Sequence, residues 1–424
     1  MSQKMCRRHF GALTGLMRLG ASHAAFSQIG STASSWPRLR QLLVEYVDGK
    51  KLAGAAIAVA QSGSALAYLQ AGRLSLQSDT AFDENSICRI YSMTKPVTGL
   101  AAMLLIEKGK LRLDQSVTDI LPEWRSLQVA IDPGKGLEAR PAKQRMTIRH
   151  LLTHTSGLAY WTPNQGTDAL SVAYRSRGIT PGNYGTGLKR PGYGPQATGL
   201  EDMVKRLAEL PLAADPGSVW RYSVSLDVMG LIIERVSGKP LDVFARDHLF
   251  EPLKMSSTGF QVPRAASGRL TTNYTVTSGG LEPLDPRETS VFLKPPGLLA
   301  GGAGVVTTAR DFARLGAMLI ADGALDGVRV IAAQSARMAR SNLLPPAVRY
   351  EGGGYGAGMR VAAGGRNAQD AAGAVSWNGA AGTMWLVDPA RRLNFVFMSQ
   401  FMPPTAYPIW GEASAALTMD RDSG

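Results

Sequence analysis

The chain contains 424 residues, 45% of them hydrophobic, which is enough to bury the core of one large domain or of two closely packed ones. The formal net charge is +13, but the basic residues are scattered and lack the signatures of RNA-binding or helix-turn-helix modules, so we expect a solvated basic surface and no nucleic-acid partner. No uninterrupted apolar run reaches about 18 residues, so no transmembrane segment is expected.

Residues 1–35 are expected to be an extension ahead of a folded domain that begins near Trp36. Arg7-Arg8, followed by an apolar stretch at 11–17, resembles a weak twin-arginine export signal. Arg18 interrupts the apolar region early, and no small-residue cleavage site follows it closely. A cytoplasmic location is therefore favoured, and export to the periplasm remains the alternative.

Hydrophobic periodicity and turn residues predict the elements in chain order. An amphipathic helix is expected at residues 37–48, followed by a hairpin whose apolar strands, 54–60 and 65–71, flank the turn 61–64. The long apolar run behind Ser92 predicts a buried helix. The later elements are helices at 146–153, 200–210, 224–236 and 309–319, strands at 374–377, 383–387 and 393–399, and a final helix near 412–418.

Strands thus cluster at both ends of the chain, with helices between them. This order predicts an α/β (α+β) fold, in which an antiparallel sheet built from both termini is flanked by helices and an all-helical domain is inserted in the middle. We expect residues 36–110 and 270–424 to form the α/β domain and residues 111–269 the helical domain. The Gly-, Pro- and Tyr-rich stretch 160–199 has little periodicity and predicts a long ordered loop, of a kind that often lines a functional site.

Ser92-Met93-Thr94-Lys95 is the strongest candidate catalytic feature and the one Ser-x-x-Lys pattern in the chain. Positions i and i+3 of a helix share a face, so the Lys95 amine can lie beside the Ser92 hydroxyl. Pro96 supports a helix start here, because a proline in the first turn lacks only an amide that has no helical partner. A desolvated lysine can lose its proton and then accept one from the serine, which turns the hydroxyl into a nucleophile.

This pattern continues in three further segments of the chain, which are residues 147–158, 216–223 and 301–311. Together with Ser92-Met93-Thr94-Lys95 they resemble the serine β-lactamase and penicillin-binding-protein superfamily over most of the chain, and the chain is most similar to the family VIII carboxylesterases. The resemblance implies a class C β-lactamase-like fold. It also assigns Tyr222, from the helical domain, as a third catalytic residue that faces the serine. A tyrosinate near a lysine ammonium can serve as base and then as acid.

Two motifs of the β-lactamases are missing. Their Tyr-x-Asn is replaced by Tyr222-Ser223-Val224, and their Lys-Thr-Gly by Trp377-Asn378-Gly379, as in the esterases of the superfamily. The resemblance then implies that Trp377, Asn378 and Gly379 contact the substrate, without the cation that would face a β-lactam carboxylate. It also implies an oxyanion hole made of the backbone amides of Ser92 and Ala380.

Competing catalytic patterns are weak. A Gly-x-Ser-x-Gly elbow is absent, which argues against an α/β-hydrolase. His150 and His154 are spaced i, i+4, but no glutamate occupies the zincin position, so we expect a structural role for them at a helix end. No metal and no cofactor is implied.

These features predict a serine carboxylesterase that hydrolyses short-chain esters of small molecules through an acyl-enzyme on Ser92. Lys95 and Tyr222 are expected to move the proton, and weak β-lactamase activity is compatible with the shared nucleophile. The alternatives are a β-lactamase or D-Ala-D-Ala peptidase, an acyltransferase that passes the acyl group to an alcohol, and a non-catalytic binding module.

Overall fold

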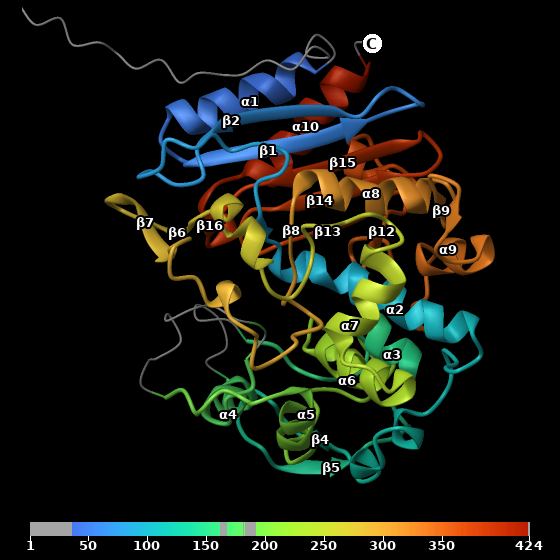
Figure 1. Ribbon diagram of the computed structural model, residues 1–424. Coiled ribbons are helices and arrows are strands. Elements are labelled where there is room, and N and C mark those ends of the chain that lie inside the picture. Colours follow the sequence, from blue (N-terminus) through green and yellow to red (C-terminus); the bar gives the residue numbers. More distant parts are fainter. Residues whose placement is uncertain (1–35, 162–167, 181, 183–191, 423–424) are drawn as a thin grey trace, which may run out of the picture.

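A seven-stranded antiparallel sheet, built from both ends of the chain, organises the upper part of the molecule in Figure 1. This computed structural model describes residues 36–161, 168–180, 182 and 192–422, so the predicted export signal lies outside the described residues. The strands follow one another across the sheet in the order β11 (Gly354–Tyr355), β12 (Arg360–Val361), β13 (Val375–Asn378), β14 (Met384–Asp388), β15 (Leu393–Met398), β1 (Gly54–Ala60) and β2 (Ala67–Gly72).

Strand β1 joins the part of the sheet that comes from the N-terminal end of the chain to the part that comes from the C-terminal end. It pairs with β15 on one side, with Ala58 opposite Val396, and with β2 on the other, with Ile57 opposite Leu69. Its sequence is apolar at every position and almost wholly buried, as expected of a strand covered on both faces. The predicted hairpin and the predicted sheet from both termini are therefore confirmed.

Helices cover both faces of this sheet (Figure 1). α1 (Pro37–Asp48) and α10 (Ile409–Asp422) pack against each other and share an apolar cluster with one face. The Asp420 carboxylate accepts the backbone N–H groups of Arg38 and Leu39, so one terminal helix caps the start of the other. α8 (Ala309–Ile320), which begins at the N-cap Thr308, packs on β1, β14 and β15 from the opposite face.

The lower part of the molecule in Figure 1 consists mainly of helices, which are α3 (Ile148–Leu152), α4 (Ala169–Ser176), α5 (Leu200–Ala208), α6 (Ser225–Ser237) and α7 (Leu241–Ala245). Helix α4 corrects the prediction of a loop throughout 160–199, because the Asp168 carboxylate accepts the Ser171 amide and starts a helical turn there. The parts of this stretch at 162–167, 181 and 183–191 lie outside the described residues. The domain boundaries given above stay a prediction.

Several short elements connect or flank these two parts. They are β3 (Cys88–Arg89) paired with β8 (Val306–Thr307), β4 (Gln128–Ala130) with β5 (Ala139–Pro141), β6 (Asn273–Thr277) with β7 (Gly280–Asp285) and β16 (Phe401–Met402), β9 (Ala324–Leu325) with β10 (Val328–Arg329), and helix α9 (Ala333–Ala339). The strands β4 and β5 show that segment 111–269 is not made of helices alone.

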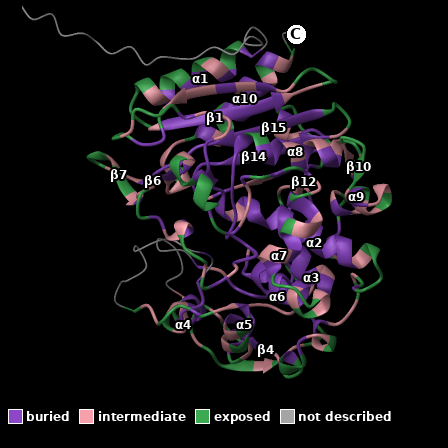
Figure 2. Ribbon diagram, viewed as in Figure 1, coloured by how far each residue is buried: buried purple, intermediate pink, exposed green. Residues whose placement is uncertain are grey.

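Helix α2 (Thr94–Glu107) runs through the centre, between the sheet and the helical part. Almost all of it is buried (Figure 2), because its apolar side chains point in every direction around the axis. It packs against α6, the helix that follows Tyr222. None of the helices in the described residues has the length and apolar character needed to cross a bilayer.

A buried arginine fixes the strand that leads into α2. The Arg89 side chain is fully buried, and its Nε donates to the Asp285 carboxylate at 2.6 Å. Its remaining nitrogens donate to the Thr271 carbonyl and the Ser290 hydroxyl, so most of the charge and the donors of the guanidinium are satisfied. This network ties β3 to the segment 271–290 just ahead of Ser92.

Candidate active site

Ser92 lies in a single 3₁₀ turn, Tyr91–Met93, that immediately precedes α2. Tyr91 adopts φ 39°, an unusual conformation for a residue with a side chain, and its ring is fully packed. The Tyr91 hydroxyl accepts a hydrogen bond from Asn273 at 3.2 Å. Ser92 itself stays half-buried while Tyr91 and Met93 are buried, so the turn presents its side chain toward the helical part of the molecule.

The structure brings the three predicted catalytic side chains together. The Ser92 Oγ lies 2.7 Å from the Tyr222 hydroxyl and 3.4 Å from the Lys95 Nζ. Lys95 stands in the first turn of α2, as the Ser-x-x-Lys spacing predicts, and its amine donates to the Gly302 carbonyl at 2.8 Å. The same nitrogen lies 4.6 Å from the centre of the Tyr222 ring. Their catalytic roles stay a prediction, but the contacts that these roles require are present.

Burial sets the proton affinities of these groups. It lowers the pKa of Lys95 from 10.5 to about 7, although the Asp227 carboxylate acts in the opposite direction. Burial also raises the pKa of Tyr222 far above its ordinary value of 10, against the effect of its hydrogen bond to Ser92. At neutral pH much of Lys95 is therefore a neutral amine, while Tyr222 is a phenol. This favours Lys95 as the proton acceptor in the resting site, and not a tyrosinate.

Tyr222 is held in place by the segment that carries the two histidines. The buried His154 ring lies 4.8 Å from the Tyr222 ring, and the His154 carbonyl accepts the Arg221 amide at 2.8 Å. Nδ1 of His154 hydrogen-bonds the Ser223 hydroxyl at 2.9 Å. Burial and the nearby Lys95 push the pKa of His154 well below 6.5, so this ring is neutral. His154 thus supports the backbone on both sides of Tyr222.

His150 has a separate role at the start of α3. Its Nδ1 accepts the Thr147 amide at 3.2 Å, while the Thr147 hydroxyl accepts the His150 amide, which together form a capping box. The structural role expected for the histidine pair at a helix end fits these contacts.

The predicted substrate-contacting residues lie at the end of strand β13, beside the turn that carries Ser92. Trp377 and Asn378 are half-buried, and the Trp377 ring centre lies 5.9 Å from that of Tyr222. At Gly379 a side chain would collide with the Ile90 carbonyl and the Thr383 hydroxyl, so only glycine lets strand and turn approach this closely.

Ala380 follows Gly379 directly and packs against the cluster formed by Tyr91, Ala303 and Ala381. The end of β13 is therefore next to the Ser92 turn, as an oxyanion hole made of two backbone amides requires. The participation of the Ser92 and Ala380 amides in such a hole stays a prediction.

Sequence reasoning missed an aromatic cluster around Trp377. Tyr355 is fully buried, its ring centre lies 5.3 Å from that of Trp377, and its hydroxyl has no hydrogen-bond partner among the described residues. Tyr350 and Trp220 lie against each other with ring centres 4.4 Å apart. Trp220 stands in the motif segment 216–223, but no local pattern links it to Tyr350 and Tyr355, which come from a distant part of the chain and meet it only in the fold.

Sequence reasoning also missed Asp227, which is buried on α6 and faces the Gly301–Val305 loop. A signal existed: this carboxylate stands five residues after Tyr222, in the apolar run of a predicted helix, where a charge is costly unless it has partners.

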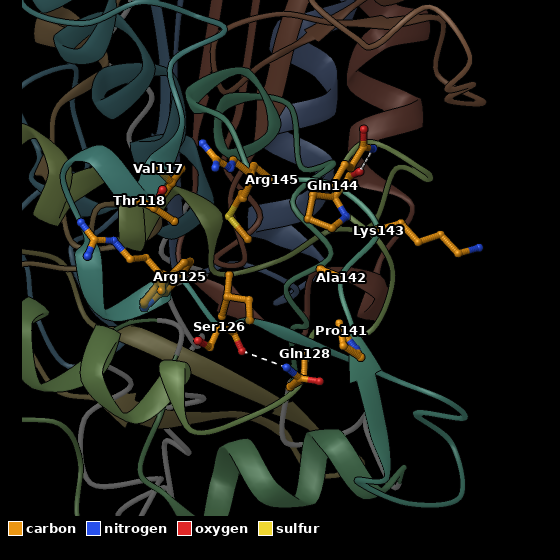
Figure 3. Close-up of a pocket in the computed structure, with 14 residues that line it drawn as sticks. Val117, Thr118, Arg125, Ser126, Gln128, Pro141, Ala142, Lys143, Gln144 and Arg145 are labelled. Carbon is orange, nitrogen blue, oxygen red and sulfur yellow. Dashed lines mark hydrogen bonds between the residues drawn. The ribbon is translucent and has the colours of Figure 1, made fainter.

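A cavity of about 420 Å³ lies apart from these residues, where β4 and β5 adjoin the segment before α3 (Figure 3). Val117, Ala142 and Met146 contribute apolar surface to it, and the Lys143 side chain points away from the other lining residues. No predicted site residue lines this cavity, so we assign it no part in the chemistry at Ser92.

Comparisons with known proteins identify the family and the fold of this chain. The sequence model of the Beta-lactamase family matches residues 39–417. Protein Rv1367c of Mycobacterium tuberculosis (strain ATCC 25618 / H37Rv) is 32% identical over 378 residues, which cover 85% of this chain and 88% of that protein. Esterase EstB of Burkholderia gladioli is 29% identical over 400 residues, which cover 88% of this chain and 92% of EstB.

Among solved structures, EstCE1, described as a hydrolase with promiscuous acyltransferase activity, is similar with a TM-score of 0.73. The two are 24% identical, and the similarity covers 90% of this chain and 98% of EstCE1. The predicted antiparallel sheet with flanking helices, in a class C β-lactamase-like fold, is confirmed by this likeness. The family match extends over nearly all of the described residues, and the chain therefore belongs to the Beta-lactamase family.

Proposed function

We propose that this protein is a serine carboxylesterase that hydrolyses small ester substrates through an acyl-enzyme on Ser92. The observation that carries the proposal is the contact of one hydroxyl with two proton-transfer groups, at 2.7 Å from Tyr222 and 3.4 Å from Lys95. A serine becomes a good nucleophile when a base within reach accepts its proton, and the buried Lys95 amine has a pKa suited to this at neutral pH.

In the first half of the reaction, the Ser92 Oγ attacks the ester carbonyl carbon and its proton passes to Lys95, directly or through the Tyr222 hydroxyl. The carbonyl oxygen becomes an oxyanion, which the amides of Ser92 and Ala380 stabilise. The intermediate then collapses, the carbon–oxygen bond to the alcohol breaks, and the departing alkoxide takes the proton from Tyr222 or Lys95. The products are the free alcohol and an ester of Ser92.

In the second half, water replaces the alcohol. Lys95 and Tyr222 accept a proton from the water, which attacks the acyl carbon, and return a proton to Ser92 as the acid leaves. An alcohol can enter in place of water, which would give acyl transfer. We propose hydrolysis as the main outcome, and product analysis with an added alcohol separates the two.

The proposal that the substrate is an ester and not a β-lactam rests on Trp377 in strand β13. The resemblance implies that Trp377 occupies the position at which β-lactamases and penicillin-binding proteins of the superfamily carry a lysine, so an indole would stand where a cation would hold a carboxylate. Esterase EstB, a relative named as an esterase, supports the ester branch, while Acyltransferase calJ of Penicillium decumbens, 29% identical over 56% of this chain, keeps acyl transfer as an alternative. A β-lactamase or D-Ala-D-Ala peptidase is the other alternative, and it requires binding of a substrate carboxylate without that cation.

The test is a comparison of kcat/KM for acetyl, butyryl and octanoyl nitrophenyl esters with kcat/KM for nitrocefin, each on wild type and on Ser92→Ala. We expect the short esters to be the better substrates and Ser92→Ala to be inactive toward all of them. Faster turnover of nitrocefin than of any short ester would overturn the proposal. Added methanol separates hydrolysis from transfer, because a transferase would release the methyl ester in place of the acid.

A further inference from the structure

We propose that Asp227 is a positioning residue. It holds Gly302, whose carbonyl orients the Lys95 amine, and its negative charge shifts the pH range in which the enzyme is active. This inference rests on the proposed function and extends it to a residue outside the Ser92, Lys95 and Tyr222 contacts. Asp227 does not touch the nucleophile. It acts on Lys95 through Gly302, whose N–H and carbonyl belong to two successive peptide groups of the loop ahead of α8.

Two hydrogen bonds to Gly302 carry this inference. The Asp227 Oδ1 accepts the backbone N–H of Gly302 at 2.9 Å, and the carbonyl of the same residue accepts the Lys95 Nζ at 2.8 Å. Lys95 in turn reaches Ser92. The N–H and the carbonyl belong to successive peptide groups that meet at the Gly302 Cα, so the bond to Asp227 fixes the residue that carries the carbonyl, and the carboxylate acts on the amine through its charge. Asp227 therefore affects both the place and the charge of the Lys95 amine.

The loop in this chain is clamped, so its carbonyl has little freedom of its own. The Thr98 hydroxyl donates to the Gly301 carbonyl at 2.6 Å, and the Thr94 hydroxyl accepts the Val305 amide at 3.0 Å. A side chain at Gly301 would collide with the Leu226 carbonyl of α6. The loop thus fits between α2 and α6 only without side chains at its tip.

Few other ionisable groups besides Asp227 lie near the Lys95 amine. Asp227 is 1% exposed. Burial raises its pKa, whereas Lys95 and the Gly302 N–H act in the opposite direction and favour the carboxylate. The other ionisable groups that face the amine are the phenols of Tyr222 and Tyr160 and the neutral imidazole of His154. Burial alone lowers the pKa of Lys95, and Asp227 is the group that opposes this effect. Removal of its charge should therefore lower that pKa further.

The test is the pH profile of kcat/KM for Asp227→Asn, whose amide oxygen can still accept the Gly302 N–H. Lys95 must be neutral to accept a proton, so activity rises with pH on an acid limb. We expect Asp227→Asn to move the midpoint of this limb to lower pH by about one unit or more, the usual effect of a nearby opposite charge. Asp311→Asn is the matched control. It removes another buried carboxylate, one that accepts the Ser257 amide, and should leave the midpoint unchanged.

An unchanged midpoint, or a shift to higher pH, in folded Asp227→Asn would overturn the inference. Circular dichroism and the melting temperature establish the fold, and Asp227→Ser, which is also neutral and smaller, must show the same shift if the asparagine variant does not fold. The rate of fluorophosphonate labelling at Ser92, followed against pH, reports the same ionisation without an ester. A wild type that neither labels nor hydrolyses esters would refute the proposed function, whereas an active wild type with an unshifted variant would refute only the role of Asp227.

Discussion

Gly379 gives the sharpest structural prediction, because it lets the strand that we expect to contact the substrate lie close to the turn that carries Ser92. A methyl group at this position would lie far inside 3.0 Å of both the Ile90 carbonyl and the Thr383 hydroxyl. The first belongs to the backbone just before Ser92 and cannot rotate away. Gly379→Ala must therefore push the end of β13 away from the Ser92 turn.

The expected loss follows from the size of this displacement. Relief of the collision needs a movement of about 1 Å, and a misplacement of that size at a reacting centre can cost about a hundredfold in rate. The Ala380 amide is carried by the same backbone, and loss of one oxyanion donor costs about a hundredfold to a thousandfold in kcat. We expect kcat for a butyryl nitrophenyl ester to fall by about two orders of magnitude with little change in KM, since the oxyanion forms only during the reaction.

Gly411→Ala is the matched control for this experiment. Gly411 lies in α10, where an added methyl group meets nothing within 4 Å, so the same chemical change should preserve kcat/KM and the melting temperature. The overpacked Gly379→Ala should lose about 1–3 kcal/mol of stability and remain folded. A folded Gly379→Ala enzyme with more than half of the wild-type kcat/KM would refute the role given to this contact.

Three further predictions concern the groups around Ser92. Lys95→Ala and Tyr222→Phe should each lower kcat at least about a hundredfold, and the double variant should fall far short of the product of the two effects, because the residues act as one unit. Near-full activity of Tyr222→Phe would show that Tyr222 only packs against the site. The acid limb of the wild-type kcat/KM profile should have its midpoint near pH 7, because the pKa of Lys95 is about 7 and the neutral amine increases as pH rises. A midpoint at the lower pH at which carboxyl groups titrate would indicate that a group other than Lys95 is the base. Trp377→Lys should shift the ratio of kcat/KM values from a butyryl ester toward a cephalosporin by a factor of about ten to a few hundred, and an unchanged ratio would show that Trp377 does not decide the substrate class.

The elements that local sequence determines were predicted well. The hairpin 54–60 and 65–71 has turn residues between two apolar runs, and its strands occur as expected in β1 and β2. The helix behind Ser92 and the strand β13 followed from equally local patterns. Helix α4 was missed because its short amphipathic stretch lies among glycines, prolines and tyrosines that dominate the composition.

Contacts between distant segments could not be predicted in this way. The ion pair of Arg89 with Asp285 joins residues 196 positions apart, and no periodicity connects them. Tyr222 was assigned from a motif, but the sequence left both a neutral Lys95 and a Tyr222 tyrosinate open as the base, because the protonation state depends on burial by side chains from several elements. The motifs therefore predict that Ser92, Lys95 and Tyr222 meet, while the structure is needed to say which of them carries the proton.

The most direct test of the central claim is the site of covalent labelling by a fluorophosphonate. We predict that the wild-type protein gains the mass of one phosphonyl group and that peptide mapping places this group on Ser92. Ester hydrolysis should be lost in step with labelling. The Ser92→Ala variant should remain folded, unlabelled and inactive. A phosphonyl group on any other serine, or ester hydrolysis that survives in Ser92→Ala, would contradict the claim that Ser92 is the nucleophile.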